Sequence, residues 1–100
     1  MNPYLALNEM ERSIVTSILN AHLPDGTSVH VFGSRAGGKP KPWSDLDLVL
    51  EALGPLPLSL TAKLAEAFEE SELPWKVDIV DRKSVNDGFG RLIDELKVAL

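Results

Sequence analysis

The chain has 100 residues, 44% of them apolar and 25% charged, which is the composition of an ordinary globular protein. A chain of this length has room for one hydrophobic core, so we expect a single domain over residues 1–100. The absence of cysteine excludes disulfides and thiolate metal sites, and the net charge of −5 argues against an extensive nucleic-acid interface.

Residues 1–12 include Glu9 and Glu11 but no long apolar run, so we do not expect a secretory signal. No later segment approaches the roughly 18–20 apolar residues that a membrane span needs. These features predict a cytoplasmic protein that does not associate with a membrane.

Two elements are predicted in the first third of the chain. Asn8 and Glu11 form a variant capping box, and apolar residues then recur at helical spacing, so we expect a helix over residues 8–22. The sequence Pro-Asp-Gly at residues 24–26 cannot continue this helix. The β-branched and aromatic run at residues 28–32 predicts a strand.

Residues 33–44 contain three glycines and two prolines, which predicts a loop that could open with a short helical turn. Residues 26–44 have no acidic side chain, whereas Arg35, Lys39 and Lys41 are all basic. A basic loop on an acidic protein suggests a small anionic ligand, although a solvated loop with incidental lysines would look the same.

Residues 45–51 alternate between leucine and other residues, which predicts a strand with one face in the core. A proline-rich connection, residues 54–57, then leads to a second helix that Ser59 could cap and that ends before Pro74. The expected buried stripe of this helix is Leu60, Leu64, Ala67 and Phe68.

Residues 75–81 alternate again and predict a third strand, after which Ser84 could cap a last helix. The apolar positions of that helix are Val85, Phe89, Leu92, Ile93 and Leu96. The predicted order of elements is α-β-loop-β-α-β-α. It indicates a two-layer α+β domain with a small mixed three-stranded sheet and helices packed on one face.

Gly33 and Ser34 directly follow the first predicted strand. A glycine there lets the backbone approach a ligand, and a helical turn would direct free N–H groups toward phosphate oxygens. The Ser34 hydroxyl would add a donor and Arg35 a positive charge. This pattern is weak by itself, because most such pairs are simply tight turns.

Ser44, Asp45 and Asp47 lie at the start of the next predicted strand. Residues two apart on a strand face the same way, so Asp45 and Asp47 could hold a hard cation such as magnesium, with substrate phosphates as further ligands. Taken alone, the two acids would more often belong to a solvated strand face, which acids commonly occupy.

Asp78 supplies a third carboxylate on the third strand. Its neighbours Val77 and Ile79 are expected to face the core. If the two strands are adjacent, Asp78 therefore joins Asp45 and Asp47 in one acidic cluster. Three carboxylates without partners repel one another, which implies bound metal or raised pKa values. Together with the basic loop, the cluster predicts a site for a nucleoside triphosphate with magnesium.

At these residues the chain resembles the minimal nucleotidyltransferases of the DNA polymerase β superfamily. Their signature is Gly-Ser, a spacer, Asp-x-Asp on a strand, and a third Asp on a later strand. The resemblance extends from about Val29 to Ile93, and the one departure is a spacer richer in lysine and proline than expected. The matching segments are Gly33-Ser34, Asp45-Leu46-Asp47 and Asp78.

The resemblance implies a two-layer polymerase β-like fold with defined roles for these residues. The triphosphate of ATP would be bound by the turn and its surroundings, namely Gly33, Ser34, Arg35 and Ser44. Two Mg²⁺ ions would be held by Asp45, Asp47 and Asp78, the last of them close to the attacking hydroxyl.

The resemblance also implies an activity, the transfer of a nucleoside monophosphate, AMP from ATP, onto a hydroxyl. Small members of this family are often encoded with HEPN-domain toxins, which implies an antitoxin that transfers AMP to a toxin tyrosine. The catalytic core would occupy all 100 residues, so we expect the acceptor to lie on a partner protein. Two alternatives stay open: transfer to a small hydroxylated molecule such as an aminoglycoside, and an antitoxin that only covers its partner.

Overall fold

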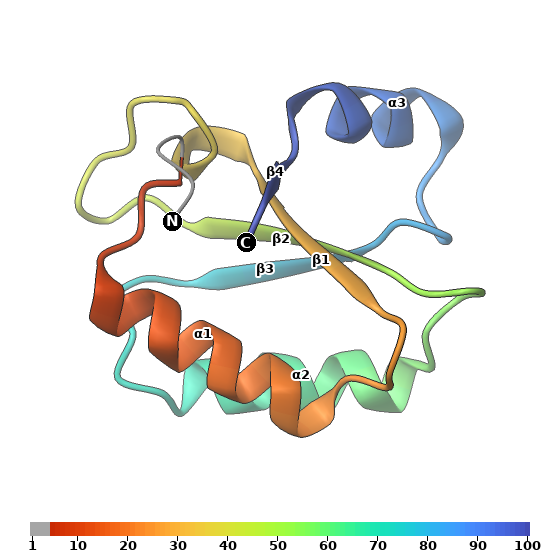
Figure 1. Cartoon of the computed structure of the whole chain (residues 1–100), viewed down its shortest axis with the longest axis horizontal. Coiled ribbons are helices and arrows are strands. Elements are labelled where there is room, and N and C mark those ends of the chain that lie inside the picture. The colour runs from red at the N-terminus through yellow and green to blue at the C-terminus, as the bar shows by residue number, and fades with distance from the viewer. Residues whose placement is uncertain (1–4) are drawn as a thin grey trace.

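Four strands form a mixed sheet at the centre of residues 5–100, the part of the chain that the computed structural model describes: β1 (Ser28–Phe32), β2 (Leu46–Glu51), β3 (Val77–Asp81) and β4 (Val98–Ala99) (Figure 1). Their order across the sheet is β3-β2-β1-β4. β1 runs antiparallel to β2 and β4, whereas β2 and β3 run parallel. The sheet therefore ends in β3 on one side and in β4 on the other.

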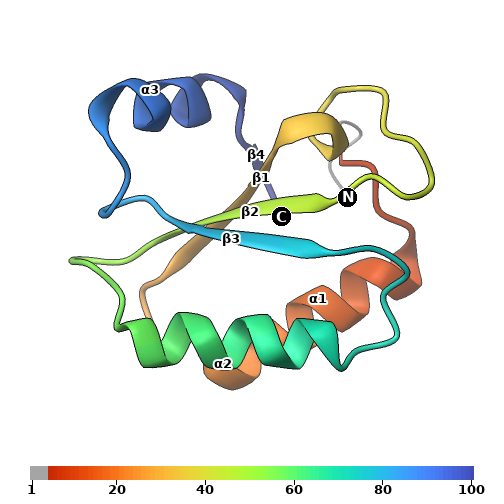
Figure 2. The same ribbon diagram turned by 180° about the vertical axis from the view of Figure 1, so that it is seen from behind.

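Two helices, α1 (Glu9–His22) and α2 (Leu58–Glu69), cover one face of the sheet, as the opposite views of Figures 1 and 2 show. Alternate residues of β2 point toward these helices because successive side chains of a strand face opposite ways. The core on this side includes Val15 and Leu19 of α1, Leu46, Leu48 and Leu50 of β2, and Leu64 and Phe68 of α2.

The third helix, α3 (Asp87–Leu96), lies on the other side of the sheet (Figures 1 and 2). Phe32 alternates with the buried Val31 and therefore faces away from α1 and α2. Its ring meets the ring of Phe89 edge-on, with the ring centroids 6.0 Å apart. The prediction that all helices pack on one face is wrong for α3, because an apolar stripe does not specify which face of the sheet it covers.

The predicted α+β class is confirmed, but the sheet has four strands rather than three. The additional strand, β4, pairs Val98 with Val31 and Ala99 with His30. A strand of two residues is too short to show the alternation by which strands are predicted.

Across residues 5–100, every helix is too short or too polar to span a lipid bilayer.

The start of the chain folds locally as its sequence predicts. The Asn8 side chain accepts a hydrogen bond from the Glu11 N–H at 2.7 Å, and the Glu11 carboxylate accepts one from the Asn8 N–H at 3.0 Å. The reciprocal capping box is therefore confirmed, and so is the strand at residues 28–32.

The predicted caps of the other two helices are wrong. α2 begins directly after Pro57, so Ser59 lies within the helix and no side chain caps it. The Ser84 hydroxyl donates to Asp81 at 2.9 Å, which holds Ser84 in the turn after β3. Asn86 caps α3 instead, because it lies directly before the first helical residue.

Candidate functional site

The sheet face opposite α1 and α2 carries two aspartates side by side. In the register of the strands, Asp47 of β2 is paired with Asp78 of β3 on one side and with Phe32 of β1 on the other. Side chains at paired positions point to the same face, and neighbouring strands are about 4.8 Å apart. The structure therefore brings these two carboxylates together on the face opposite the core leucines.

Asp45 lies one residue before β2, and its side chain is exposed. Residues two apart on an extended chain face the same way, so Asp45 lies on the same side as Asp47. Burial raises the pKa of Asp47 above its ordinary value of 3.8, and the negative charges of Asp78 and Asp45 raise it further. Asp45, Asp47 and Asp78, here called the acidic trio, thus form one electrostatic cluster.

One cation without a functional signal in the sequence, Lys76, lies against the acidic trio. The Nζ atom of Lys76 is 3.4 Å from Oδ1 of Asp78, and the two side chains are 74% and 42% exposed. An ion pair that is so open to water stabilises its carboxylate only weakly. Lys76 therefore leaves most of the charge repulsion within the acidic trio in place.

The acidic trio offers carboxylate oxygens, which are the ligands that magnesium prefers. Among residues 5–100, no three acidic, histidine or cysteine side chains are already close enough together to hold an ion. Magnesium does not need such a cage, because it retains several waters and binds through one or two carboxylates and the substrate phosphates. A divalent cation would also relieve the repulsion that raises the pKa of Asp47. The residues present therefore fit the ion.

The backbone of Gly33, directly after β1, lies close to the side chain of Asp47 in the acidic trio. It begins a short 3₁₀ turn, Gly33–Arg35, with a φ of +75°, which L side chains rarely adopt. A Cβ atom added at Gly33 would collide with Oδ2 of Asp47. Glycine is therefore required here for both the turn and the position of Asp47. The turn places Ser34, whose side chain is exposed, directly after this contact.

Arg35 occupies a position different from the one predicted. Only 6% of its surface is exposed, and its guanidinium lies over the Trp75 ring, 4.4 Å from the centroid. Its nitrogens donate to the main-chain oxygens of Ala6 (3.0 Å), Lys41 (3.4 Å), Pro42 (3.4 Å) and Ser44 (3.0 Å). The side chain therefore stabilises the loop at residues 36–44 through hydrogen bonds to its carbonyls and does not project toward a triphosphate.

Ser44 closes the same loop next to the acidic trio. Its hydroxyl oxygen accepts a hydrogen bond from the Lys41 N–H at 2.8 Å, and its own N–H donates to the Lys41 carbonyl at 3.0 Å. Ser44 immediately precedes Asp45, so these bonds fix the chain where β2 begins. In this structure the observed role of Ser44 is to close the loop.

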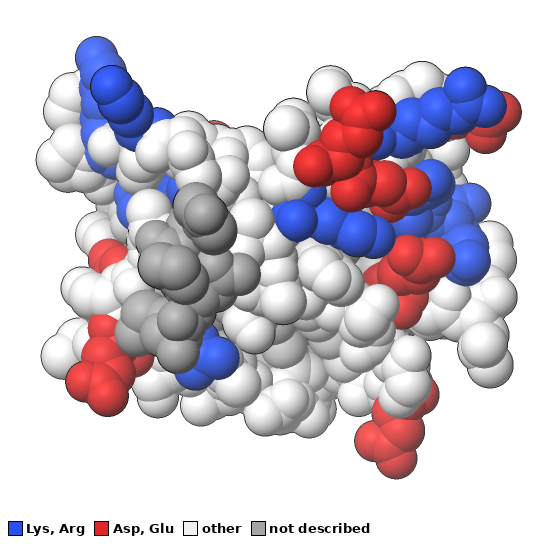
Figure 3. All heavy atoms as spheres, turned by 45° about the horizontal axis from the view of Figure 1, so that its top comes forward, with Lys and Arg blue, Asp and Glu red and all other residues white. Residues whose placement is uncertain are grey.

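The tip of the loop carries positive charge at the surface. Lys39 and Lys41 lie on this segment, and Figure 3 shows basic side chains without acidic neighbours at its upper left, where the loop projects. The Nζ atom of Lys41 lies 5.5 Å from the centroid of the Trp43 ring, which is 70% exposed. The loop thus presents two cations and an open aromatic surface near the acidic trio.

The family model described as "Nucleotidyltransferase domain" matches residues 12–99. A Haemophilus influenzae protein named "Probable protein adenylyltransferase MntA" is 41% identical over 96 residues, which cover 96% of this chain and 83% of that protein.

Solved structures share the fold. A crystal structure of a toxin-antitoxin with AMP-PNP has a TM-score of 0.72 and 24% identity, and the match covers 93% of this chain and 72% of the other. A structure described as a minimal nucleotidyltransferase has a TM-score of 0.70 and 30% identity, with coverage of 91% and 90%.

Proposed function

The chain belongs to the nucleotidyltransferase domain family, and from this membership we propose that it is a magnesium-dependent protein adenylyltransferase. It transfers AMP from ATP onto a hydroxyl group of a partner protein. The observation that carries the proposal is the pairing of Asp47 with Asp78 directly beside the Gly33 turn. The name of the Haemophilus influenzae relative, a protein adenylyltransferase, supports the choice of acceptor.

Each part of the site has one role in this proposal. Asp45, Asp47 and Asp78 would hold magnesium through their carboxylate oxygens, with Asp78 contributing from the edge strand β3. Magnesium held there would supply positive charge next to the triphosphate and would lower the pKa of the acceptor hydroxyl. The main-chain N–H groups of the Gly33–Arg35 turn and the Ser34 hydroxyl donate to phosphate oxygens.

Two further residues of the predicted nucleotide site act through the loop. Arg35 is a positioning residue, because its buried guanidinium bonds to four main-chain oxygens of the surrounding segments. Ser44 holds the loop where it meets Asp45. Lys39 and Lys41 add positive charge that attracts the triphosphate to this side of the molecule.

The reaction is an in-line displacement at the α-phosphorus of ATP. The acceptor oxygen forms a bond to that phosphorus while the bond to the bridging oxygen of pyrophosphate breaks, and pyrophosphate leaves with the electron pair. A carboxylate oxygen of Asp78 orients the acceptor hydroxyl and takes its proton. Catalysis therefore depends on positioning and on charge stabilisation rather than on a covalent enzyme intermediate.

We infer that the acceptor is a HEPN-domain toxin and that the chain acts as its antitoxin. Solved structures that share this fold are toxin-antitoxin complexes, one of them containing AMP-PNP. Attachment of AMP to a tyrosine of the toxin would block its activity by adding a bulky, negatively charged group. Because the reaction consumes ATP, we also place it in the cytoplasm.

The test is to incubate the protein with the HEPN-domain partner, ATP and magnesium, and then to measure the intact mass of the partner. We expect the partner to gain the mass of one or more AMP groups, and we expect no gain when EDTA replaces magnesium. Tight binding without a mass gain would show an antitoxin that only covers its partner. Modification of small alcohols alone would show a small-molecule acceptor.

A further inference from the structure

β3 has a free edge next to the proposed catalytic site. It is the last strand of the sheet, and among residues 5–100 it pairs with β2 only. The Lys76 carbonyl accepts a hydrogen bond from the Leu46 N–H, and the Arg82 N–H donates one to the Leu50 carbonyl. The main-chain groups of the even-numbered residues of β3 are therefore the ones that bond to β2. By the alternation of a strand, the N–H and C=O groups of Val77 and Ile79 point outward from the sheet. They are available to another strand.

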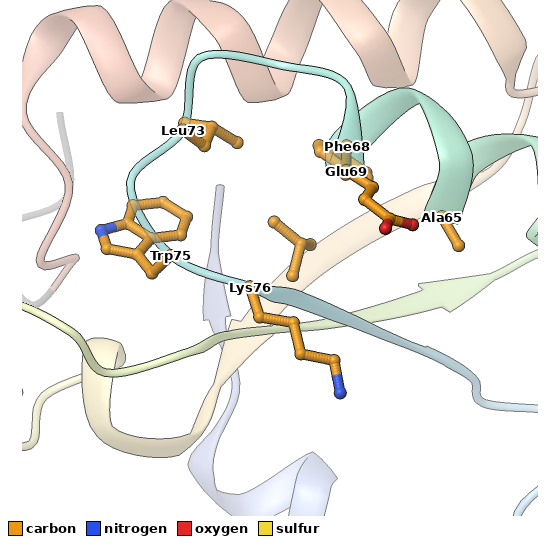
Figure 4. Close-up of a pocket in the computed structure, with 7 residues that line it drawn as sticks. Ala65, Phe68, Glu69, Leu73, Trp75 and Lys76 are labelled. Atoms are coloured by element: carbon orange, nitrogen blue, oxygen red, sulfur yellow. The ribbon is translucent and has the colours of Figure 1, made fainter.

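An apolar groove follows this edge between β3 and α2. One hollow of about 370 Å³ is lined by side chains that include Ala65, Phe68, Leu73 and Trp75, which Figure 4 shows around it, whereas Lys76 extends away from them. A second hollow of about 510 Å³ continues along the strand and is lined by Ala65, Lys76, Val77, Asp78 and Ile79, among others. We call these two hollows together the β3 groove.

The β3 groove is continuous with the site because Asp78 belongs to both. Asp78 lines the second hollow and is also the strand partner of Asp47. A chain lying in the groove would therefore pass a carboxylate that we assign to the acceptor hydroxyl. This continuity indicates which molecule occupies the groove, since the acceptor must come this close.

We propose that an extended segment of the acceptor protein binds the β3 groove as an added strand, with its hydroxyl residue opposite Asp78. This inference rests on the proposed function. Main-chain bonds to Val77 and Ile79 would fix the register of the segment. An added strand would lie about 4.8 Å from β3, and its residue opposite Asp78 would point to the same face as Asp47 and Asp78.

The alternation of the added strand gives the acceptor a sequence requirement. The residues on either side of the hydroxyl residue point to the opposite face, where the β3 groove presents Ala65, Phe68 and Trp75. The acceptor segment should therefore read apolar–hydroxyl–apolar. A small soluble alcohol has neither the main chain nor the apolar side chains to use this surface.

A variant of the groove wall tests the proposal with a matched control. Ala65 is exposed on α2 and lines both hollows, so Ala65→Trp fills the groove without disturbing the core. Lys63 is exposed on the same helix and lines neither hollow, so Lys63→Trp adds the same side chain elsewhere. We expect Ala65→Trp to raise the KM for the acceptor protein about tenfold or more, with ATP binding unchanged. We expect Lys63→Trp to behave as the natural protein.

Hydrogen exchange on the natural protein separates this inference from the proposed function. If the acceptor protein is modified and its binding slows exchange at the Val77 and Ile79 amides, the docking in the β3 groove and the proposed function are both supported. Modification without this protection, or with normal KM in Ala65→Trp, overturns the docking and leaves the function. Slower exchange at Val77 and Ile79 without modification of the acceptor protein supports the docking and overturns the transfer. If the exchange does not slow and the acceptor protein is not modified, both the docking and the proposed function are overturned.

Discussion

Opposite ends of the β2–β3 pair carry aspartates in contrasting surroundings. At the start of the pair, Asp47 lies beside Asp78 and Asp45, and burial together with these charges raises its pKa. At the far end, Asp81 accepts hydrogen bonds from the Leu56 N–H at 2.8 Å and from two groups of the following turn. Burial acts to raise the pKa of Asp81, but these bonds outweigh it and lower the pKa.

The contrast shows how the same residue type serves two purposes in one small protein. A carboxylate whose oxygens are fully bonded holds the chain in place, and the register directs it away from the acidic trio because Asp81 pairs with the core residue Leu50. A carboxylate with negative neighbours costs stability until a cation binds. Matched substitutions at the two ends should therefore separate stability from activity.

The largest expected effect is the loss of activity in Asp47→Asn. The amide is a poor magnesium ligand, so we expect AMP transfer to fall about a thousandfold, equivalent to about 4 kcal/mol in the transition state. The far-UV circular dichroism should not change. The matched variant Asp81→Asn should keep transfer within a few-fold of the natural protein, and equal activity in Asp47→Asn would remove Asp47 from the site.

The next largest effect is expected for Gly33→Ala, which acts on Asp47 through the backbone. Alanine at φ +75° is strained, and its Cβ displaces the Asp47 carboxylate, so we expect a loss of transfer of about a hundredfold. Gly26→Ala is the control for strain alone, because Gly26 has a φ of +86° and nothing within 4 Å of an added Cβ. If both variants lose the same activity, the contact with Asp47 does not matter.

A smaller effect, on stability, is expected for Asp81→Asn. The amide can accept at one oxygen only, so at least one hydrogen bond to the turn after β3 or to Leu56 is lost, at a cost of about 1–2 kcal/mol in the free energy of unfolding. Urea unfolding measures this cost. Because the folded pKa of Asp81 is lowered, its contribution is present above pH 3.8 and is lost as the pH falls through the folded value. A pH-independent cost would contradict this account.

The smallest expected effect is a gain in stability for Asp47→Asn. The folded pKa of Asp47 is raised, so its ionisation costs stability as the pH rises above 3.8, and asparagine avoids that cost. The melting temperature of the variant should therefore exceed that of the natural protein at neutral pH, with a difference that narrows in acid. Added magnesium should raise the melting temperature of the natural protein more than that of the variant.

The sequence correctly predicts the first helix cap and the first strand, whose signals are local, but it misplaces the caps of the two later helices. The capping box at Asn8 and the β-branched run at residues 28–32 depend on neighbouring residues, and both are confirmed. The adjacency of Asp47 and Asp78 required the additional assumption that their strands are neighbours, which the register satisfies. Because successive side chains of a strand point to opposite faces, the sequence then predicts the face of the sheet on which each residue lies.

Other features depend on contacts that no local pattern encodes. β4 pairs through only two residues. α3 lies on the second face of the sheet, with Phe89, Leu92 and Leu96 exposed, although its apolar residues recur at the same spacing as those of α2. The role of Arg35 could not be predicted, because its partners are main-chain oxygens brought together by the path of the loop. Residue types at those positions carry no signal of this arrangement.

The most direct test of the central claim is a crystal structure with Mn²⁺ in place of magnesium and a non-hydrolysable ATP analogue. The anomalous signal of the metal should lie against the carboxylates of Asp45 and Asp47 on the side of Asp78, with the triphosphate on the N–H groups of the Gly33–Arg35 turn. A metal bound away from Asp47, or a triphosphate held elsewhere on the molecule, would contradict the assignment of the acidic trio.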